Sequence, residues 1–364
     1  MYKKIRTLHL NGKLLDSRGL ISFCVQKNNC QGTLSWEREI TDFILEWLSD
    51  NKEITVKTSG STGLPKEIKL LKNNMLNSAR MSIDYLHLNK GTKALLCMPV
   101  RFIAGRMMVI RAMLGGWELF YSKPALNPFK EIDSDFRFNF TAITPMQLAS
   151  VFTDEKSKTL LDNTDKIIVG GAPLTFALVE KCKDLRTCVF ETYGMTETIS
   201  HIALKKINGN DKSDYFELLQ GITISADERN CLVINAPGLS ESEIITNDIV
   251  EIKDPFHFRF IGRHDHIINS GGMKISPELT ESKINKLTDR NFYISFIPDE
   301  LLGEKVVLVM EGASPGAEKE LEFLNKCRLV LDKYEMPKQI LYKRIFLKTE
   351  NGKLIREAGD KLQT

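Results

Sequence analysis

Apolar residues along the chain follow two spacings, which alternate through much of its length. Ile40, Phe43, Ile44, Trp47 and Leu48 recur at helical spacing, which predicts an amphipathic helix over residues 37–49. Short apolar runs predict strands at 53–58, 67–71, 93–98, 117–121, 140–144, 166–169 and 187–190. Helical patterns fall near 73–86, 105–114, 145–152 and 174–183. Strands that alternate with helices are typical of an α/β fold with a largely parallel sheet.

The pattern changes after about residue 215. Segments 215–224, 230–235 and 249–261 have the β-branched and apolar composition of antiparallel strands. A last block has the order helix, strand, strand, helix, strand, at 277–287, 291–297, 304–310, 317–332 and 339–342. We therefore predict a large N-terminal α/β domain with layered, mostly parallel sheets and a small β-rich subdomain, residues 1–262, and a small α+β C-terminal domain, residues 263–364.

Composition excludes several classes of protein. Lysine and arginine number 50 and aspartate and glutamate 47, so the formal net charge of the 364 residues is +3 and gives no basic surface for nucleic acid or an anionic membrane. Arg101, Arg106 and Arg111 interrupt the most apolar stretch, 94–120, so we expect no membrane span. The seven cysteines form no CxxC pair, and the first residues contain no apolar secretion-signal core. We therefore expect reduced thiols and a cytoplasmic location.

A segment rich in glycine and hydroxyl side chains, TSGSTGLPK at 58–66, follows one predicted strand and precedes another. Glycine lets a backbone approach a phosphate closely, hydroxyl and N–H groups can surround the anion, and a lysine adds a mobile charge. The spacing between Gly63 and Lys66 differs from that of a Walker A motif. The alternative is an ordinary hairpin loop. The candidate phosphate-binding residues are Thr58, Ser59, Gly60, Ser61, Thr62, Gly63 and Lys66.

Three further segments combine chemically useful residues. YGMTET at 193–198 follows a predicted strand, where an aromatic ring can stack on a base, a threonine can hold a phosphate oxygen and a glutamate can bind Mg²⁺. Its alternative is a turn with helix-capping character. FIGRHDHIINSGGMKISP at 260–277 lies at the predicted domain boundary. KTENGKLIR at 348–356 presents Lys353 after an Asn-Gly turn, and its alternative is a solvated basic hairpin tip.

Together and in this order, the four segments resemble the adenylate-forming superfamily of acyl-CoA synthetases, adenylation domains and luciferases, over roughly residues 53–360. The resemblance implies that a carboxylate attacks the α-phosphate of ATP, with Mg²⁺ present, and that coenzyme A then displaces AMP from the acyl-adenylate. It also implies that the C-terminal domain is a mobile lid. Because Thr58 lies much closer to the first residue than the family's phosphate loop does, we expect a shortened leading subdomain.

The resemblance also assigns residues of the first predicted domain to the nucleotide. The 58–66 segment would embrace the phosphates of ATP. Tyr193 would pack on the adenine, Thr196 would bind the α-phosphate and Glu197 would hold Mg²⁺, with Thr196 and Glu197 counted among the catalytic residues. Gly171 and Ala172, from the GGAP segment at 170–173, would line the adenine and acyl pocket.

Further residues are assigned around the predicted boundary and in the lid. Asp248 and Arg263 would hold the ribose, and Asp265 would be the hinge. Lys353 would catalyse adenylation. The coenzyme A side would be formed by Gly271 and Gly272.

The chain departs from the family's usual pattern in several places. Asn247 stands where glycine usually precedes the ribose-binding aspartate, and Leu347 stands where proline usually opens the lysine segment. His266 replaces a second acidic residue beside the hinge, and the pair Arg101-Phe102 stands where an aromatic–histidine pair is common. We expect the ribose contact to survive, since it depends on the aspartate, and the gate to the acyl pocket to differ.

A narrower resemblance suggests which carboxylic acid is the substrate. Within the superfamily the pattern is most similar to that of the o-succinylbenzoyl-CoA synthetases of menaquinone biosynthesis. Their substrate has an aromatic ring and two carboxylates, so its pocket needs an apolar slot and donors for the non-reacting carboxylate. The candidates are Arg101, Phe102, Arg106, Ser200 and His201.

Two alternatives stay open: a coenzyme A ligase for a benzoate-like aryl acid, and a non-catalytic nucleotide-binding relative. The expected partners are the acid, ATP and coenzyme A, with no nucleic acid or membrane. A homo-oligomer is compatible with the sequence.

Overall fold

The structure is a computed structural model that describes residues 7–57, 67–347 and 354–362. The chain forms two compact units. The first contains Met1–Leu174, Lys181–Thr223 and Ile234–Ile244, and the second contains Thr175–Glu180, Ile224–Val233 and Ile245–Thr364. The domain limit predicted after residue 262 stays a prediction, because this division depends on packing and says nothing about movement of one part against another.

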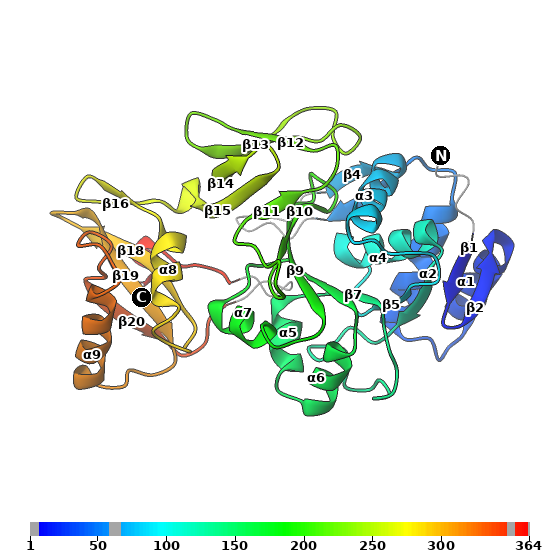
Figure 1. Cartoon of the computed structure of the whole chain (residues 1–364), viewed down its shortest axis with the longest axis horizontal. Coiled ribbons are helices and arrows are strands. Elements are labelled where there is room, and N and C mark those ends of the chain that lie inside the picture. Colours follow the sequence, from blue (N-terminus) through cyan, green and yellow to red (C-terminus); the bar gives the residue numbers. More distant parts are fainter. Residues whose placement is uncertain (1–6, 58–66, 348–353, 363–364) are drawn as a thin grey trace. The chain divides into compact units, whose positions relative to one another are not determined.

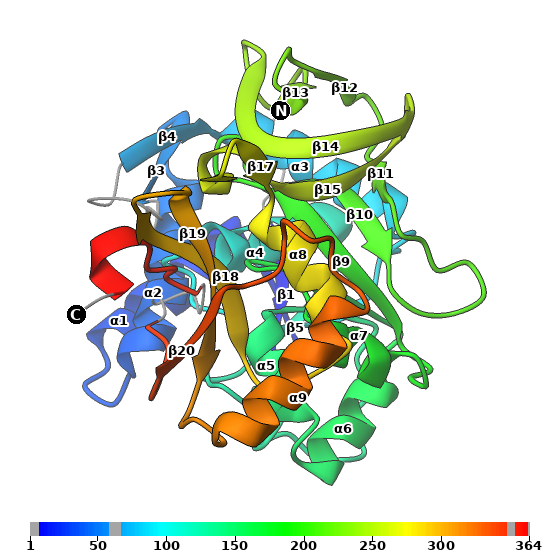
Figure 2. The same cartoon turned by 90° about the vertical axis from the view of Figure 1, so that its left-hand side faces the viewer.

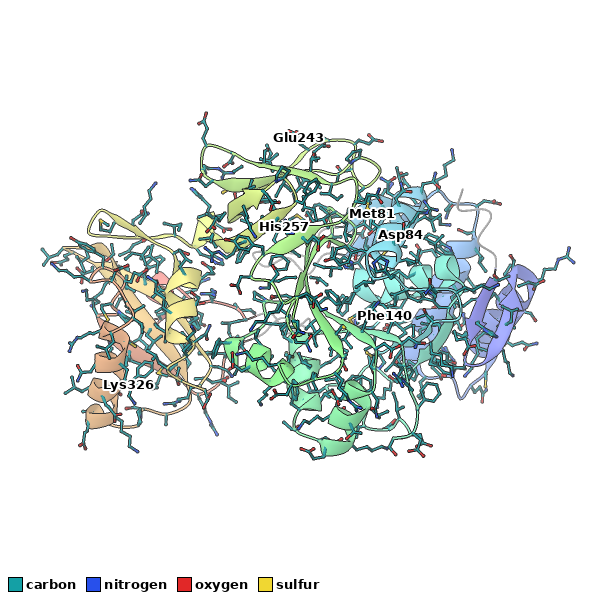
Figure 3. All side chains as sticks on the ribbon, in the orientation of Figure 1. Met81, Asp84, Phe140, Glu243, His257 and Lys326 are labelled. Carbon is teal, nitrogen blue, oxygen red and sulfur yellow. The ribbon has the colours of Figure 1, made fainter. Side chains whose placement is uncertain are left out.

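A mostly parallel sheet forms the centre of the first unit (Figure 1). Its strands, in chain order, are β1 (Thr7–Leu10), β2 (Lys13–Asp16), β5 (Lys93–Leu96), β6 (Glu118–Tyr121), β7 (Phe140–Ile143), β8 (Lys166–Val169), β9 (Cys188–Gly194), β10 (His201–Lys206) and β11 (Phe216–Leu218). They lie in the order β11-β10-β9-β8-β7-β5-β6-β1-β2. Pairing is parallel from β9 to β1, and antiparallel between β1 and β2 and from β9 through β10 to β11. All four residues of β7 are buried, including Phe140, which Figure 3 labels. The predicted α/β class is confirmed.

Helices of the first unit pack on this sheet and on one another. They are α1 (Ser17–Asn29), α2 (Ser35–Leu48), α3 (Lys72–Tyr85), α4 (Ile103–Gly115), α5 (Pro145–Val151) and α6 (Glu155–Asp162). Helix α4 contacts β1, β5 and β6 and lies beside α3. Helix α2 buries Ile40, Phe43, Ile44 and Trp47, as its apolar spacing predicted. Among the described residues, every helix is too short or too polar to cross a membrane.

A buried lysine joins α2 to the start of α3. The ammonium group of Lys72 donates to the carbonyl oxygens of Glu46, Trp47 and Ser49, each at 2.9 Å. These carbonyls lie at the carboxyl end of α2, where a helix leaves acceptors without partners and favours a positive charge. Burial lowers the pKa of Lys72, but its hydrogen bonds compensate the buried ammonium within the chain.

Two strands bracket the glycine- and hydroxyl-rich segment. β3 (Glu53–Lys57) pairs antiparallel with β4 (Glu67–Leu71), from Glu53 opposite Leu71 to Lys57 opposite Glu67. The predicted strands on both sides of residues 58–66 are therefore confirmed.

The second unit contains β14 (Ile244–Asp254), which pairs antiparallel with β15 (His257–Arg263). Its C-terminal sheet has the order β17-β16-β19-β18, with β20 parallel to β19. The remaining elements of this region are the 3₁₀ helix His264–His266, β16 (Ile268–Ser270), β17 (Met273–Ile275), α8 (Pro277–Ile284), β18 (Phe292–Asp299), β19 (Gly303–Glu311), α9 (Ala317–Arg328), β20 (Gln339–Lys343) and the 3₁₀ helix Gly359–Leu362. Four elements include residues of both units: β14, whose first residue belongs to the first unit, and α7 (Phe176–Cys182), β12 (Thr223–Ala226) and β13 (Cys231–Asn235).

Both faces of the C-terminal sheet are covered. Helices α8 and α9 lie over one face (Figure 2), where Ile284 and Cys327 share a buried cluster with Ile294 and Leu308. On the opposite face, a second buried cluster contains Tyr293, Ile297, Val307, Val309, Phe346 and Leu362. Side chains of successive strand residues point to opposite faces, so one strand feeds both cores.

Several elements differ from the prediction. Helix α1 was not predicted; it buries just Leu20 and Cys24, which leaves a weak periodic signal. Helix α6, strand β10 and the hairpin of β16 and β17 were not predicted either. Helix α3 begins at Lys72, one residue before the predicted helical pattern. These elements are short or depend on neighbours that are distant in sequence.

Candidate active site

The loop that follows β9 is held tightly against the strand that comes after it. At Gly194, an added Cβ would lie 2.4 Å from the carbonyl oxygen of Ser200, a distance that no side chain tolerates. Glycine at the end of β9 therefore allows the chain to turn directly into β10. The turn lies at the carboxyl end of a parallel strand, where open α/β sheets bind ligands.

Hydrogen bonds within the loop fix its shape. The Thr198 hydroxyl, which is buried, accepts from the N–H of Met195 at 3.0 Å and lies 2.9 Å and 2.8 Å from the carbonyl oxygens of Met195 and Ser200. Ile199 has φ +68°, a left-handed conformation that a β-branched residue rarely adopts, and is 1% exposed. Strain of this kind persists only where the surroundings enforce it, and it concentrates at functional sites.

This loop presents the predicted phosphate and metal residues. The N–H of Ile199 donates to the carbonyl oxygen of Thr196 at 2.9 Å, while the Thr196 side chain is half-buried and Glu197 is exposed. Tyr193, just before the loop, lies with its ring centroid 5.8 Å from that of Phe216 at 59°. An aromatic face, a hydroxyl and a carboxylate therefore follow one another at the end of β9.

The GGAP segment is fastened to the same strand. An added Cβ at Gly170 would lie 2.2 Å from the hydroxyl of Thr192, and Gly171 has φ +91°. The carboxylate of Glu191 accepts from the N–H of Leu174 at 2.9 Å and pairs with Lys205 at 2.7 Å. The predicted residues Gly171 and Ala172 thus lie in a segment held beside β9 at both ends. Sequence reasoning missed Glu191, although a carboxylate in an otherwise apolar strand was a usable signal.

Two of the predicted acyl-pocket residues belong to a buried polar cluster with Arg111 and Ser82. The Nη2 of Arg111, on α4, donates to the Oγ of Ser200 at 2.8 Å and of Ser82, on α3, at 3.3 Å. The Nε2 of His201 lies 2.9 Å from the same Ser82 oxygen. Figure 3 labels Met81 and Asp84, which mark this turn of α3. Arg111, Ser82, Ser200 and His201 are called the Arg111 cluster below.

Burial shifts the titration of both ionisable members of the Arg111 cluster. It lowers the pKa of Arg111 to about 10. Burial, and secondarily the positive charge of Arg111, lowers the pKa of His201 well below 6.5. The cluster at neutral pH therefore combines a guanidinium cation with a neutral imidazole.

The other acyl-pocket candidates have partners elsewhere. Arg101 is exposed, pairs with Glu39 at 3.2 Å and lies over the ring of Phe102. Arg106 donates to the carbonyl oxygens of Val100 at 3.0 Å and Thr55 at 2.8 Å. These contacts fasten the start of α4, and the place of Arg101, Phe102 and Arg106 in an acyl pocket stays a prediction.

The predicted ribose and hinge residues meet in the second unit. Asp248 lies opposite Arg263 in the β14–β15 pair, and their side chains are 3.1 Å apart. Arg263 also forms two hydrogen bonds with Asp265, at 2.9 Å and 2.7 Å. The hydrogen bonds from Arg263 lower the pKa of Asp265. In turn, the carboxylates of Asp265 and Asp248 raise the pKa of Arg263. The Asp248–Arg263–Asp265 group is thus a linked set of charges, with Asn247 accepting from Arg229 at 3.1 Å beside it.

The glycine pair forms the turn of the β16–β17 hairpin. Gly271 and Gly272 have φ +57° and +83°, and both are exposed. Two successive positive φ angles are the geometry of a tight hairpin turn, which explains why glycine occupies both positions. The N–H of Gly271 donates to the carbonyl oxygen of Leu302 at 2.8 Å. Their predicted role toward coenzyme A stays a prediction.

Some predicted residues lie outside the described part of the chain. They are Thr58, Ser59, Gly60, Ser61, Thr62, Gly63, Lys66 and Lys353. Their roles stay predictions from the sequence.

Comparisons with known proteins agree with this arrangement. A family model described as AMP-binding enzyme matches residues 56–224. A solved structure described as an acyl-CoA synthetase (AMP-forming)/AMP-acid ligase II-like protein from Dyadobacter fermentans is 37% identical, with 92% of this chain and 95% of that one covered and a TM-score of 0.63. The "Probable 2-succinylbenzoate--CoA ligase" of Mycobacterium tuberculosis is 26% identical over 294 residues, 74% of each protein.

A second solved structure has a similar fold at low identity. It is described as o-succinylbenzoate CoA synthetase from Bacillus subtilis in complex with the acyl-adenylate intermediate; it is 15% identical, with 96% and 94% of the chains covered and a TM-score of 0.73. Given 37% identity over almost the full length of the Dyadobacter protein, the chain belongs to the AMP-binding enzyme family that its residues 56–224 match.

Proposed function

We propose that the chain is an AMP-forming acid–thiol ligase that makes an acyl-CoA from a carboxylic acid, ATP and coenzyme A. In the first half-reaction, a carboxylate oxygen of the acid attacks the α-phosphorus, and the bond to the β-phosphate breaks to release pyrophosphate. In the second, the coenzyme A sulfur attacks the acyl carbon, the thiol proton is lost and AMP leaves. Membership of the AMP-binding enzyme family supports this reaction class.

The observation that carries the proposal is the rigid loop after β9. Its internal hydrogen bonds and the left-handed Ile199 hold Thr196 and Glu197 in place before any ligand arrives. A hydroxyl positioned in advance can donate to an α-phosphate oxygen without reorganising during the reaction, which is how preorganised donors lower a barrier. Tyr193 would cover one face of the adenine, because its ring lies immediately before the loop.

Magnesium fits the donor set of this loop. Mg²⁺ is usually held by one or two carboxylates together with substrate phosphates, and Glu197 is an exposed carboxylate of that kind. No group of three or more metal-ligating side chains occurs within residues 7–57, 67–347 and 354–362. The proposed magnesium ion would therefore be held by Glu197 together with the phosphates of ATP. The bound ion supplies positive charge where a carboxylate approaches a polyphosphate. Lys66 and Lys353 would add to that charge.

The Asp248–Arg263–Asp265 group would couple the nucleotide to the lid. Asp248 would accept from the ribose hydroxyls, and Arg263 would hold Asp248 in position through their 3.1 Å contact. The 263–364 domain would turn about Asp265 after adenylation. This would withdraw Lys353 and bring the Gly271–Gly272 turn to the thiol, a closure mode in which a hinge exchanges two faces.

For the acid we propose o-succinylbenzoate, with a benzoate-like aryl acid as the second choice. The names of the Mycobacterium relative and of the Bacillus structure support this substrate. We place the enzyme in the cytoplasm, which agrees with seven cysteines that form no disulfide.

Pyrophosphate release over a panel of carboxylic acids, each with and without coenzyme A, tests the function. We expect o-succinylbenzoate to give the highest kcat/KM, and acyl-CoA to form only when coenzyme A is added. A response to benzoate-like acids alone would move the assignment to the second choice. No acid-dependent pyrophosphate with any member of the panel would favour the non-catalytic relative.

A further inference from the structure

A row of three side chains crosses the sheet from β9 through β10 to β11. Lys205 on β10 lies directly opposite Glu191 on β9 in their antiparallel register. On the other side of β10, Leu204 pairs with Glu217 of β11. The next position of that register brings Phe216 opposite Lys205. Residues directly opposite one another in neighbouring strands share a face of the sheet, so these three side chains lie together. They are called the Lys205 row below.

The ammonium group of Lys205 lies between a carboxylate and an aromatic ring. Its Nζ is 2.7 Å from Oε2 of Glu191 and 4.8 Å from the ring centroid of Phe216, which is within cation–π range. Glu191 is 7% exposed and Phe216 is 6% exposed. A buried carboxylate costs stability unless it is paired, so Lys205 compensates the charge of Glu191 where it stands.

The second oxygen of Glu191 holds one of the two predicted adenine contacts, the GGAP segment at 170–173. Oε1 accepts from the N–H of Leu174 at 2.9 Å, and Leu174 directly follows that segment. The two oxygens of one carboxylate thus have different tasks. One is fixed by Lys205, and the other fixes the end of the GGAP segment beside β9.

The opposite end of the Lys205 row supports the other predicted adenine contact, Tyr193. Its ring centroid lies 5.8 Å from that of Phe216 at 59°, a tilted arrangement that aromatic pairs favour. Tyr193 stands two residues after Glu191 on β9 and therefore points to the same face. Ala203 lies opposite Tyr193 on β10, and its small side chain leaves the ring room to reach Phe216 diagonally.

Lys206, the next residue of β10, has an ion pair of a different kind. Its Nζ lies 2.5 Å from Oδ1 of Asp211, whose side chain is 72% exposed. Adjacent residues of a strand point to opposite faces, so Lys206 does not belong to the Lys205 row. An exposed pair of this kind contributes little, whereas the buried pair of the row passes its geometry on to a backbone N–H and to a second ring.

We propose that Lys205 and Glu191 are positioning residues that set the distance between Tyr193 and the GGAP segment, and thereby the affinity for the adenine of ATP. The inference rests on the proposed ligase function and deepens it. Glu191 holds the GGAP segment, Phe216 supports Tyr193, and Lys205 joins the two. Adenine is remote from the reacting phosphorus, so these contacts act equally in the ground state and the transition state. Their loss therefore raises KM for ATP and leaves kcat largely unchanged.

Acid-dependent pyrophosphate release at varied ATP concentration tests the role of Lys205. Lys205→Met should raise KM for ATP about 10-fold, the effect expected for loss of one charge pair and one ordered aromatic contact. We expect kcat and KM for o-succinylbenzoate to stay within about twofold of wild type. Lys205→Arg keeps the charge above the ring and should restore KM for ATP.

The same assay tests whether Glu191 acts through both of its oxygens. Glu191→Gln keeps an acceptor for the N–H of Leu174 but loses the charge, so it should raise KM for ATP less than Glu191→Leu does. The double variant Lys205→Met/Glu191→Gln should show less than the combined effect of the two single changes, because each residue acts through the other.

The control is Lys206→Met, which removes a charge from the opposite face of the same strand and should leave KM for ATP at the wild-type value. If Lys205→Met does not fold, Lys205→Gln and Phe216→Leu decide the question through the same KM. An unchanged KM for ATP in the Lys205 and Glu191 variants, or equal rises in KM for ATP and for the acid, would overturn the inference while leaving the ligase function standing. A wild type that binds ATP but releases no acid-dependent pyrophosphate would instead count against the proposed function. Calorimetric affinities of the same variants for ATP would then decide the inference by themselves.

Discussion

Two arginines of this chain are removed from water in different ways. Arg111 in the first unit is 2% exposed, and among the described residues its hydrogen bonds go to serine hydroxyls. Arg356 in the second unit is partly buried and forms two hydrogen bonds with the carboxylate of Glu281, including an Nη2–Oε2 hydrogen bond of 2.8 Å. Burial alone would lower the pKa of Arg356, but the charge and hydrogen bonds of Glu281 raise it. Burial also lowers the pKa of Arg111, and no carboxylate of the described residues opposes that shift.

The difference separates a cation that a carboxylate of the same unit neutralises from one that no carboxylate of the described residues neutralises. The carboxylate that pairs with Arg356 is itself held in place, because Glu281 also accepts from the N–H of Ile294 at 2.7 Å. On the same helix, a carboxylate oxygen of Glu278 lies 2.6 Å from Nδ1 of His266, beside the predicted hinge. Helix α8 thus links the residue next to the hinge with the segment that follows Lys353. Arg356 is anchored there by the carboxylate of Glu281.

The largest effect is expected at Lys353, which stands three residues before Arg356 in the sequence. Lys353→Ala should abolish adenylate formation, with a loss of about 3 kcal/mol or more in transition-state stabilisation, by analogy with the removal of one preorganised donor. Conversion of preformed acyl-adenylate to acyl-CoA should remain largely intact, because the lysine neutralises charge only in the first half-reaction. Separate assays of the two half-reactions measure this. Equal losses in both would contradict the exchange of lid faces.

The paired arginine should be sensitive to loss of its partner. Glu281→Ala leaves the guanidinium of Arg356 without its carboxylate, and we expect the free energy of unfolding to fall by roughly 2–4 kcal/mol. Urea unfolding followed by circular dichroism measures it. The matched control is Glu322→Ala on α9, whose exposed pair with Lys326 should contribute less than about 1 kcal/mol. Similar small changes in both variants would remove the distinction between a structural and an exposed pair.

The histidine beside Arg111 should make the first unit sensitive to acid. Because the pKa of folded His201 lies well below 6.5, the unfolded chain binds a proton that the folded chain excludes as the pH falls below 6.5. Stability is therefore lost on acidification, by up to about 1.4 kcal/mol per pH unit for one proton. His201→Gln should reduce that slope between about pH 6.5 and 5. Urea unfolding over this range compares the two proteins, and identical slopes would show that His201 is not the group responsible.

The smallest stability change is expected at Arg111 itself. Arg111→Met removes an uncompensated charge together with two hydrogen bonds to hydroxyls, so these terms oppose each other and the free energy of unfolding should change by about 1 kcal/mol or less. The same urea titration measures it beside Glu281→Ala. A loss as large as that of Glu281→Ala would place both arginines in the same structural class.

Much of this arrangement follows from local sequence. The apolar spacing predicted α2, and the YGMTET segment identified the loop after β9, because strand, turn and motif lie next to one another in the chain. Arg111 was visible only as a charge that interrupts an apolar stretch. Its role depends on Ser82 and Ser200, which are 29 and 89 residues away, and periodicity carries no information on such contacts.

Backbone strain and glycine contacts were also beyond local reasoning. The left-handed conformation of Ile199 contradicts its intrinsic preference and is enforced by neighbours. Gly194 was visible in the motif, but the reason for it is a contact with Ser200 that only the folded chain creates. Ile199 is thus a position where local preference fails, and it lies beside Thr196 and Glu197, as expected for a functional loop.

The most direct measurement is identification of the product formed without coenzyme A. Purified enzyme is mixed with ATP, Mg²⁺ and o-succinylbenzoate, and the bound nucleotide is analysed by mass spectrometry before and after coenzyme A is added. We predict an acyl-adenylate together with released pyrophosphate, then AMP and the acyl-CoA once the thiol is present. Formation of ADP and phosphate, or of no acid-dependent nucleotide product, would contradict an AMP-forming ligase.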